Sequence, residues 1–301
     1  MLEEFEYNGQ IMGTNYSIAI ICSEAPLAKE MFDISLSEIQ NYERIFSRFS
    51  PTSELSILND KKKLIVSPIF LAVISKAKEL FIETQGFFNP LVQVSRIGYN
   101  KNFINLKFNT EINNQESYNL DFSKIIIDSE KSMVHLQSGQ KLDFGGFLKG
   151  YLAEIIAKKI MANSTEIRGV IVNLGGDIHT RGLDRDGQKF SFQIYNPVIN
   201  NGEIKILLYN QSLATSGTYK RTWQVANQRF HHILDQTGLG NPKTDIVSAS
   251  IVCPDGARSE AYTKVFLARN HLEAMELLKQ PEINYIIINK EGEIIKNENI
   301  L

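Results

Sequence analysis

One short stretch, Asp143–Tyr151, constrains the fold of this chain more than any other. It reads DFGGFLKGY and joins extended residues before it to apolar residues at helical spacing after it. Gly145 and Gly146 let the backbone turn tightly and approach a ligand closely, because neither residue carries a Cβ atom. The pattern predicts a strand end, a glycine turn and a helix that runs from Phe147 onward.

The start of that predicted helix offers free backbone N–H groups and the positive end of the helix dipole. Lys149 falls in the first turn, where a cation opposes the dipole unless an anion binds there as well. The sequence therefore indicates a phosphate or carboxylate site at this turn. An ordinary strand–turn–helix with a surface lysine explains the same residues equally well.

Composition bounds the class of protein. The 301 residues are enough for a full core, and we expect one α+β domain over 1–301 or two intimately packed halves. The hydrophobic content of 43% and charged content of 22% are ordinary for a soluble protein. The net charge of −2 argues against a nucleic-acid partner. No segment reaches the apolar length of a transmembrane helix.

The N-terminal residues, Met1–Glu6, are acidic and lack the basic and apolar regions of a signal peptide. We expect a protein that stays in the cytoplasm, or one that acts in the periplasm or at a membrane anchor after its export signal has been removed. Cys22 and Cys253 have no metal-type spacing, so buried free thiols are the expected state.

Helices and strands alternate irregularly along the chain, with many hairpin-like neighbours. This order favours an α+β fold with mixed, largely antiparallel sheets and packed helices over a doubly wound sheet. Asn8-Gly9 supplies the expected turn of an N-terminal hairpin, although Met12-Gly13-Thr14 also interrupts the pattern. We read Asn100–Leu120 as a variable loop.

Polar clusters follow several predicted strands, where rigid scaffolds place functional groups. Asn173–Asp177 could cradle a ligand, but a plain glycine turn is the simpler interpretation. Ser216-Gly217 with Arg221 could contact phosphate, and a solvated turn is as good an explanation.

His231 and His232 are neighbours on a predicted strand, so their side chains point to opposite faces. One of them could carry a proton at a site, because histidine titrates near neutral pH. Core or surface histidines with satisfied hydrogen bonds are the commoner situation. A metal site made of both is not expected, because adjacent strand residues cannot easily share one ion.

Ser259 and Thr263 lie four residues apart on a predicted helix that begins near Ala257, so they share a face. Glu260 is next to that face. Hydroxyl and carboxylate groups at a helix start could bind a hard cation such as Mg²⁺. Capping of the helix by Ser259 is the simpler interpretation of the same residues.

In their order along the chain, these motifs resemble those of the FAD:protein FMN transferases, the ApbE family. The resemblance runs from Met12 to about Phe266, and the ordered set is far more specific than any single motif. Its segments are MGT at 12–14, SRFSPTSEL at 47–55, GFFNP at 86–90, DFGGFLKGY at 143–151, VNLGGDI at 172–178, TSGTYKR at 215–221, HHILD at 231–235 with Thr237-Gly238, and Thr263.

The resemblance implies an ApbE-like fold and a defined reaction. Such enzymes bind FAD and, with Mg²⁺, cleave its pyrophosphate, attach FMN to a threonine or serine hydroxyl of an acceptor protein through a phosphoester, and release AMP. Catalysis is implied for His232. The implied FAD contacts are Met12, Phe49, Leu91, Val92, Gln93, Asp143 and Lys149. The implied metal ligands are the Gly146 carbonyl, Ser259, Glu260 and Thr263.

Departures from the family pattern concern acidic residues. Ser259 stands where the family usually has a metal-binding Asp, Tyr262 replaces a further frequent Asp, and Glu154 closes the central motif in place of Asp. Fewer carboxylates weaken a Mg²⁺ site, although Glu260 could substitute if the helix rotates or shifts. Two alternatives follow: a flavin-binding member that transfers slowly or not at all, and a relative that hydrolyses FAD to FMN and AMP.

Overall fold

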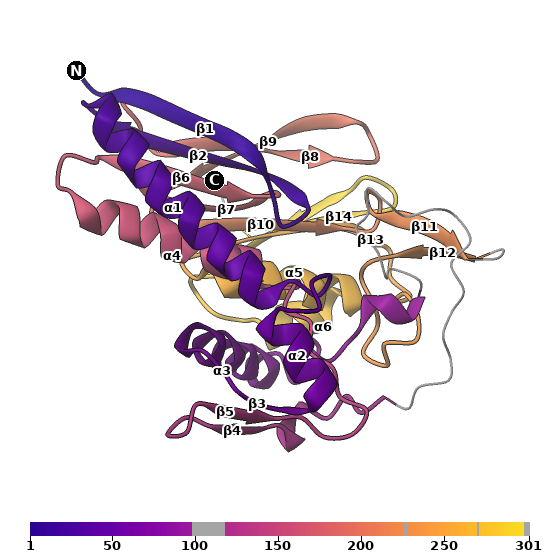
Figure 1. The fold of residues 1–301 in the computed structure, drawn as a ribbon. Coiled ribbons are helices and arrows are strands. Elements are labelled where there is room, and N and C mark those ends of the chain that lie inside the picture. The colour runs from indigo at the N-terminus through magenta and orange to yellow at the C-terminus, as the bar shows by residue number, and fades with distance from the viewer. Residues whose placement is uncertain (98–117, 226–227, 270, 298–301) are drawn as a thin grey trace.

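The computed structural model describes residues 1–97, 118–225, 228–269 and 271–297. Its main feature is an eight-stranded sheet in the order β1-β2-β6-β7-β10-β13-β14-β15, and every neighbouring pair is antiparallel (Figure 1). The α+β fold with a largely antiparallel sheet is thus confirmed. The strands of this sheet are β1 (Glu3–Ile11), β2 (Thr14–Cys22), β6 (Gly169–Leu174), β7 (Asp177–Gly182), β10 (Ser212–Gly217), β13 (Ile246–Cys253), β14 (Asn284–Asn289) and β15 (Ile294–Lys296).

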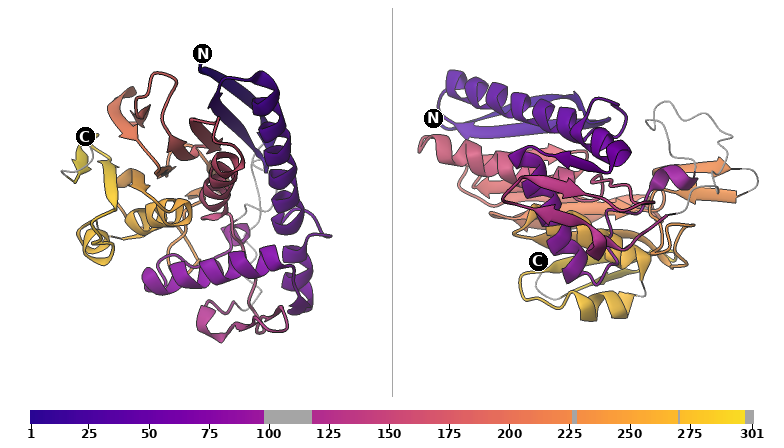
Figure 2. Two further views of the ribbon diagram at one scale, coloured as in Figure 1. Left: turned by 90° about the vertical axis from the view of Figure 1, so that its left-hand side faces the viewer. Right: turned by 60° about the horizontal axis from the view of Figure 1, so that its bottom comes forward.

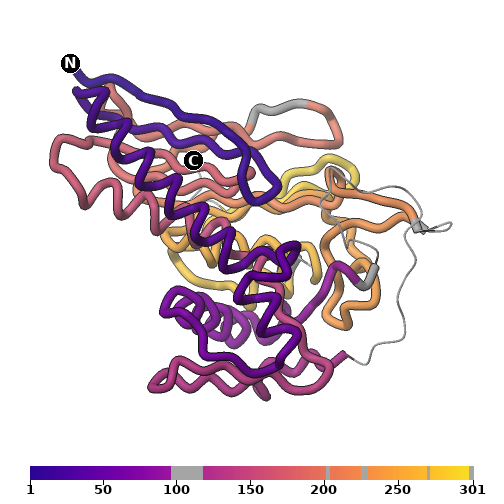
Figure 3. The backbone as a smooth tube through the Cα atoms, viewed as in Figure 1, coloured from indigo at the N-terminus to yellow at the C-terminus, as the bar shows by residue number. Residues whose placement is uncertain are grey.

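The remaining elements surround this sheet, and Figure 3 traces the chain through them. One small sheet contains β3 (Lys63–Ile65), β5 (Met133–His135) and β4 (Ile126–Asp128), and two hairpins contain β8 (Phe190–Asn196) with β9 (Asn201–Leu208) and β11 (Thr222–Val225) with β12 (Gln228–His231). The helices are α1 (Ala25–Phe46), α2 (Glu54–Lys61), α3 (Pro68–Glu83), α4 (Leu148–Asn163), α5 (Gly256–Ala268) and α6 (His271–Leu277), with 3₁₀ turns at Val94–Ile97 and Phe122–Lys124.

Both faces of the large sheet are covered. Successive residues of a strand point to opposite faces, and on β13 Ile251 belongs to the main core whereas Val252 belongs to a second cluster. Helices α4 and α5 pack on the first face, and Ile194 and Ile206 of the β8–β9 hairpin cover the second (Figures 1 and 2). Burial on both faces explains why β13 carries apolar and small side chains throughout.

Helix α3 and the three-stranded sheet lie beyond α5, away from the large sheet (Figure 1). The main apolar core extends through these layers and includes residues from Ile11 to Ile287. One domain, or two closely packed halves, stays a prediction. Within the described ranges, no helix combines the length and the apolar character that a membrane crossing requires.

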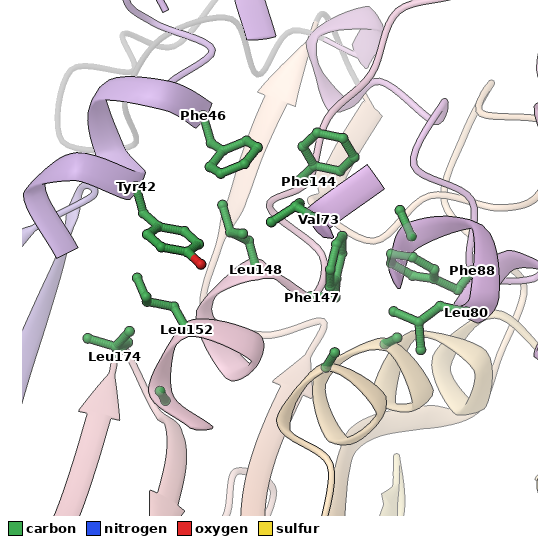
Figure 4. Packing of buried hydrophobic residues seen from close by; sticks show 14 of the residues in the cluster. Tyr42, Phe46, Val73, Leu80, Phe88, Phe144, Phe147, Leu148, Leu152 and Leu174 are labelled. Carbon is green, nitrogen blue, oxygen red and sulfur yellow. The ribbon is translucent and has the colours of Figure 1, made fainter. Parts of the chain in front are cut away.

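Aromatic side chains anchor the turn before α4 on both sides (Figure 4). The rings of Phe144 and Phe147 lie edge to face with centroids 5.9 Å apart, and Phe144 meets Phe46 and Phe70 in the same manner at 5.6 and 5.7 Å. Edge-to-face contacts are favourable for aromatic rings. Gly145 and Gly146 are therefore held between two buried phenylalanines.

Helices α4 and α5 cross with their backbones in direct contact. A Cβ atom at Gly150 would lie 2.1 Å from the Gly256 carbonyl oxygen, and one at Gly256 would lie 2.0 Å from the Gly150 oxygen. Only glycine fits at this crossing. The Gly256 N–H donates to Oε2 of Glu154 at 2.6 Å, and the Gly150 N–H donates to Oε2 of Glu260 at 2.9 Å. The crossing thus brings the start of α4 against the start of α5.

The structure corrects the expected position of the N-terminal hairpin turn. Asn8 and Gly9 pair with Ser17 and Tyr16 inside the β1–β2 ladder, so the predicted turn there is wrong. The chain turns instead at Met12-Gly13, where both φ angles are positive. Most of the predicted loop Asn100–Leu120 lies outside the described residues.

The sequence pattern also failed to indicate strand β10. Apart from Leu213 it carries Ser, Ala, Thr and Gly in place of the large apolar residues that identify a strand. The strand nevertheless pairs with β7 and β13 in the large sheet. Small side chains suit this position because α5 packs closely over β10, and the Thr263 hydroxyl oxygen lies 2.7 Å from Oγ of Ser216.

Candidate functional site

A cavity of 620 Å³ opens beside the glycine turn before α4. This volume is typical of sites for small molecules and cofactors. Its walls come from the β1–β2 turn, the end of α1, the turn after α3, the start of α4, the residues after β10 and β12, and α5. The lining residues are Met12, Gly13, Thr14, Glu43, Phe46, Ser47, Arg48, Phe49, Phe87, Phe88, Asn89, Val92, Val94, Asp143, Gly145, Gly146, Leu148, Lys149, Lys220, Arg221, His232, Ile233, Leu234, Asp235 and Lys264.

One part of the lining is aromatic. Phe49 is 50% exposed, although such rings are usually buried, and the Arg48 guanidinium lies over it at 4.8 Å from the centroid. The same guanidinium donates to Oδ2 of Asp143 at 3.0 Å. Phe87 and Phe88 line the cavity from the turn after α3. Phe49 therefore offers apolar ring surface to a ligand, and Arg48 holds Asp143 beside it.

Hydrogen bonds fix the backbone at the cavity entrance. The Met12 N–H donates to Oε1 of Glu43 at 2.8 Å, which ties the β1–β2 turn to α1. The Gly145 N–H donates to Oδ1 of Asp143 at 2.9 Å, which closes the glycine turn. Met12 and Asp143 are therefore placed by local contacts that need no ligand.

Lys149 connects α4 to two buried carboxylates. Its Nζ donates to Oδ2 of Asp177 on β7 and, at 2.8 Å, to Oε1 of Glu260 on α5. The side chains of Asp177 and Glu260 are only 6% and 1% exposed. Burial opposes the charge on Lys149, but the two carboxylates outweigh it and raise its pKa. The anions that the sequence indicated at this turn include the protein's own carboxylates.

Glu260 is shared by two lysines. The Lys264 Nζ donates to the Glu260 backbone oxygen at 3.0 Å and contacts Oε1 at 3.4 Å. Burial favours the neutral acid, yet Lys149, Lys264 and the Gly150 N–H hold the pKa of Glu260 well below its usual range. Burial also lowers the pKa of Lys264 itself, against the attraction of the carboxylates. A buried amine of this kind favours a nearby anion.

The residues expected to bind magnesium make contacts within the protein. The Ser259 hydroxyl donates to the Gly256 carbonyl at 2.8 Å, and the Thr263 hydroxyl donates to the Glu260 carbonyl at 2.6 Å and lies 2.7 Å from Oγ of Ser216. Both carboxylate oxygens of Glu260 are engaged, and of the four expected ligands only Gly146 lines the cavity. In the part of the chain that the structure describes, no group of three or more His, Cys, Asp or Glu residues could hold a metal ion.

His232 faces the cavity directly after β12. Its Nδ1 is buried and has no hydrogen-bond partner among the described residues. Burial, helped by Arg221 and Lys264, lowers the pKa of His232 to about 3, so its ring is neutral at neutral pH. The neighbouring His231 is held differently, because its N–H and its ring nitrogen Nδ1 both contact the Asn241 side chain.

The sequence-predicted site residues divide into two groups. Seven of them line the cavity: Met12, Phe49, Val92, Asp143, Gly146, Lys149 and His232. The other five do not: Leu91, Gln93, Ser259, Glu260 and Thr263. Gln93 lines a smaller cavity of 320 Å³ nearby, and its Nε2 donates to the Lys141 carbonyl at 2.8 Å.

Sequence reasoning missed Lys264. The available signal was the spacing of Glu260 and Lys264, which are four residues apart on one helix and therefore neighbours on its surface. It also treated Asp177 as a local hydrogen-bonding residue, whereas its carboxylate pairs with a lysine on another element.

Comparison with known proteins gives a consistent result. The family model described as "ApbE family" matches residues 12–287. The chain is 24% identical to an FAD:protein FMN transferase of Klebsiella pneumoniae, over 97% of this chain and 91% of the relative. It is 20% identical to the FAD:protein FMN transferase of Escherichia coli K12, over 96% of this chain and 85% of the relative.

Solved structures agree on the fold. The ApbE protein from Thermotoga maritima superposes with a TM-score of 0.83 at 22% identity, covering 98% of this chain and 97% of that one. The flavin transferase ApbE from Vibrio cholerae superposes with a TM-score of 0.80 at 21% identity, covering 99% and 97%.

Proposed function

The chain belongs to the ApbE family, and from that premise we propose that it transfers FMN from FAD to a threonine or serine hydroxyl of an acceptor protein and releases AMP. The observation that carries this proposal is one cavity in which aromatic rings, lysine and arginine side chains and His232 meet. Each of these groups matches one part of the proposed reaction.

The two kinds of wall suit the two parts of FAD. Phe49 offers an exposed aromatic ring to the flavin, which stacks favourably on such groups, and Phe87 and Phe88 also line the cavity. Lys264 and Arg221 offer positive charge to the diphosphate, for which charge-assisted hydrogen bonds are the strongest contacts available. A volume of 620 Å³ suits enclosure of a substantial part of such a ligand.

In the proposed reaction, the acceptor hydroxyl oxygen forms a bond to the phosphorus on the FMN side of the diphosphate. The bond from that phosphorus to the bridging oxygen breaks, and AMP leaves with the electron pair. His232 takes the proton of the hydroxyl, because its ring is neutral and faces the cavity. The cationic side chains offset the negative charge around the attacked phosphorus.

Magnesium, which the family resemblance adds to this reaction, does not find a fitting set of ligands among the residues present. Ser259 and Thr263 do not line the cavity, and both carboxylate oxygens of Glu260 are engaged by Lys149 and the Gly150 N–H. The proposed steps are therefore assigned only to side chains that line the cavity.

Release of AMP separates the proposed transfer from its alternatives. With FAD present, we expect AMP to form only when an acceptor protein is added. AMP formation at the same rate without acceptor would identify a hydrolase, and bound FAD with no AMP in either mixture would identify a flavin-binding protein. Chromatography of the nucleotides measures all of these outcomes.

The catalytic role of His232 can be tested by substitution, with the adjacent His231 as the matched control. His232→Ala should abolish AMP release while the affinity for FAD stays nearly intact, because the variant removes the proton acceptor and leaves the rings and cations in place. His231→Ala should retain transfer, because Asn241 holds that ring by its own contacts. Equal loss in both variants would remove the catalytic role proposed for His232.

A further inference from the structure

Four charged side chains meet beside the cavity, and the two lysines among them are bound in different ways. Lys149 bridges Asp177 and Glu260, although its single positive charge offsets only one of their two negative charges. Buried carboxylates without a cationic partner are strongly destabilising, so Lys149 has a structural reason to be there. Lys264 supplies the second positive charge, and it does so through Glu260 alone.

Lys264 keeps donor capacity for a ligand. An ammonium group has three N–H donors, and in the described part of the chain the Lys264 Nζ uses them only toward the backbone oxygen and Oε1 of Glu260. The contact with Oε1 is long, at 3.4 Å, and the side chain is 18% exposed and lines the cavity. A donor therefore remains that can point toward a molecule in the cavity.

The position of Lys264 also opposes a divalent cation. Lys149 and Lys264 both contact the same atom, Oε1 of Glu260. A magnesium ion that used this carboxylate would lie beside two ammonium groups, and like charges at such distances repel strongly away from bulk water. Magnesium further requires near-octahedral oxygen ligands, which the hydroxyls of Ser259 and Thr263 do not complete here.

We propose that the Lys264 ammonium group takes the place of a divalent cation in this protein, so that it binds the diphosphate of FAD without magnesium. This inference rests on the proposed function, which supplies the ligand. During transfer, Lys264 donates a hydrogen bond to a non-bridging phosphate oxygen and exchanges no proton. The phosphorus–oxygen bonds form and break as described above, and the hydroxyl proton still goes to His232.

Titration with magnesium in the absence of FAD tests the first half of the proposal. Isothermal titration calorimetry of the unmodified protein should show no saturable binding of Mg²⁺ at millimolar concentrations. Lys264→Thr, which removes the ammonium group and adds a hydroxyl, should gain Mg²⁺ binding. Saturable Mg²⁺ binding by the unmodified protein would overturn the proposal, and this arm does not depend on FAD.

Flavin fluorescence tests the second half. The affinity of the unmodified protein for FAD should be the same in EDTA as in Mg²⁺. Lys264→Met in EDTA should weaken FAD binding by about 10-fold or more, as expected for the loss of a charge-assisted hydrogen bond. Lys29→Met provides the control, because Lys29 is an exposed lysine on α1 and should leave FAD binding unchanged.

The outcomes separate this inference from the proposed function. FAD binding that tightens at least tenfold on addition of Mg²⁺, or that survives Lys264→Met unchanged, would overturn the role of Lys264 alone. No FAD binding in either buffer would overturn the proposed function and the ligand assigned to Lys264. Lys264→Arg keeps the positive charge and should retain magnesium-independent binding, which guards against a folding defect in Lys264→Met.

Discussion

The start of α4 and the middle of α5 each bring one lysine to the same oxygen of Glu260, but the two lysines have different surroundings. Lys149 contacts two carboxylates that are almost fully buried. Lys264 makes a close contact with the backbone oxygen of Glu260 and a longer one with the carboxylate of the same residue. A buried lysine whose charge is matched by carboxylates holds the fold together. One with remaining donors beside a cavity is available to a ligand.

The largest effect should come from removing the structural lysine. Lys149→Met leaves Asp177 and Glu260 buried with insufficient positive charge, and we expect a loss of about 3–5 kcal/mol in the free energy of unfolding. Chemical denaturation measures this quantity. Lys159→Met on the same helix is the matched control, because that lysine is 61% exposed and its pair with Glu38 should contribute less than about 1 kcal/mol. Similar losses in both variants would contradict the structural role of Lys149.

A slightly smaller effect should follow when the contact between the two helices is disturbed. Gly150→Ala places a methyl group 2.1 Å from the Gly256 carbonyl oxygen, so α4 and α5 must separate. Overpacking of this kind should cost about 3 kcal/mol of unfolding free energy. Gly240→Ala meets nothing within 4 Å and is the control. A Gly150→Ala variant as stable as Gly240→Ala would show that the crossing is not close.

Lys264→Met should affect stability much less than Lys149→Met. Glu260 keeps Lys149 and the Gly150 N–H as partners, so we expect a loss of about 1 kcal/mol, the size of one ordinary hydrogen bond. The same denaturation experiment gives the comparison directly. If the two lysine variants were equally unstable, Lys264 would be a structural residue and the distinction between the helices would fail.

The smallest effect concerns His179, a buried histidine whose ring is uncharged and forms no ion pair with a carboxylate. Arg181 Nε donates to Nε2 of His179, so that nitrogen is an acceptor and the ring is uncharged. Burial, with Arg181, lowers the pKa of His179 to about 3. The unfolded chain therefore binds a proton first, at a pKa of about 6.5, and stability present above that pH is lost as the pH falls toward 3.

Acidification from pH 8 to pH 6 should therefore cost roughly 1 kcal/mol through His179. His179→Gln should show a correspondingly flatter dependence of unfolding free energy on pH over this range. An unchanged slope would mean that His179 is not the group that titrates.

The fold was accessible from the sequence where local patterns agree with tertiary packing. Helix α1 spans Ala25–Phe46, and its apolar residues repeat at helical spacing over that range. Pro68 begins α3 as expected for proline at the first helical position. The hairpin-like order of strands predicted an antiparallel sheet. Strand β10 was not predicted, because its side chains are mostly small. The close packing of α5 over this strand explains them, and the local sequence pattern does not reveal that packing.

The candidate site was predictable to the extent that its residues lie in recognisable motifs. Seven of the predicted residues line the cavity, since their motifs form its walls. The pairing of Lys149 with Asp177 and Glu260 depends on the crossing of α4 over α5, which no local pattern reveals. Lys264 was missed for the same reason: its spacing from Glu260 was visible, but its access to the cavity follows only from the packed helices.

The most direct test of the account is the mass of an acceptor. A threonine-containing acceptor protein is incubated with this protein and FAD in EDTA, and its intact mass is measured, followed by peptide mapping. We predict a gain equal to FMN less one water on a threonine or serine, absent without FAD and no larger when Mg²⁺ replaces EDTA. An acceptor that gains this mass only with Mg²⁺ would contradict the role of Lys264, and one that stays unmodified in both buffers while FAD is bound would contradict the proposed transfer.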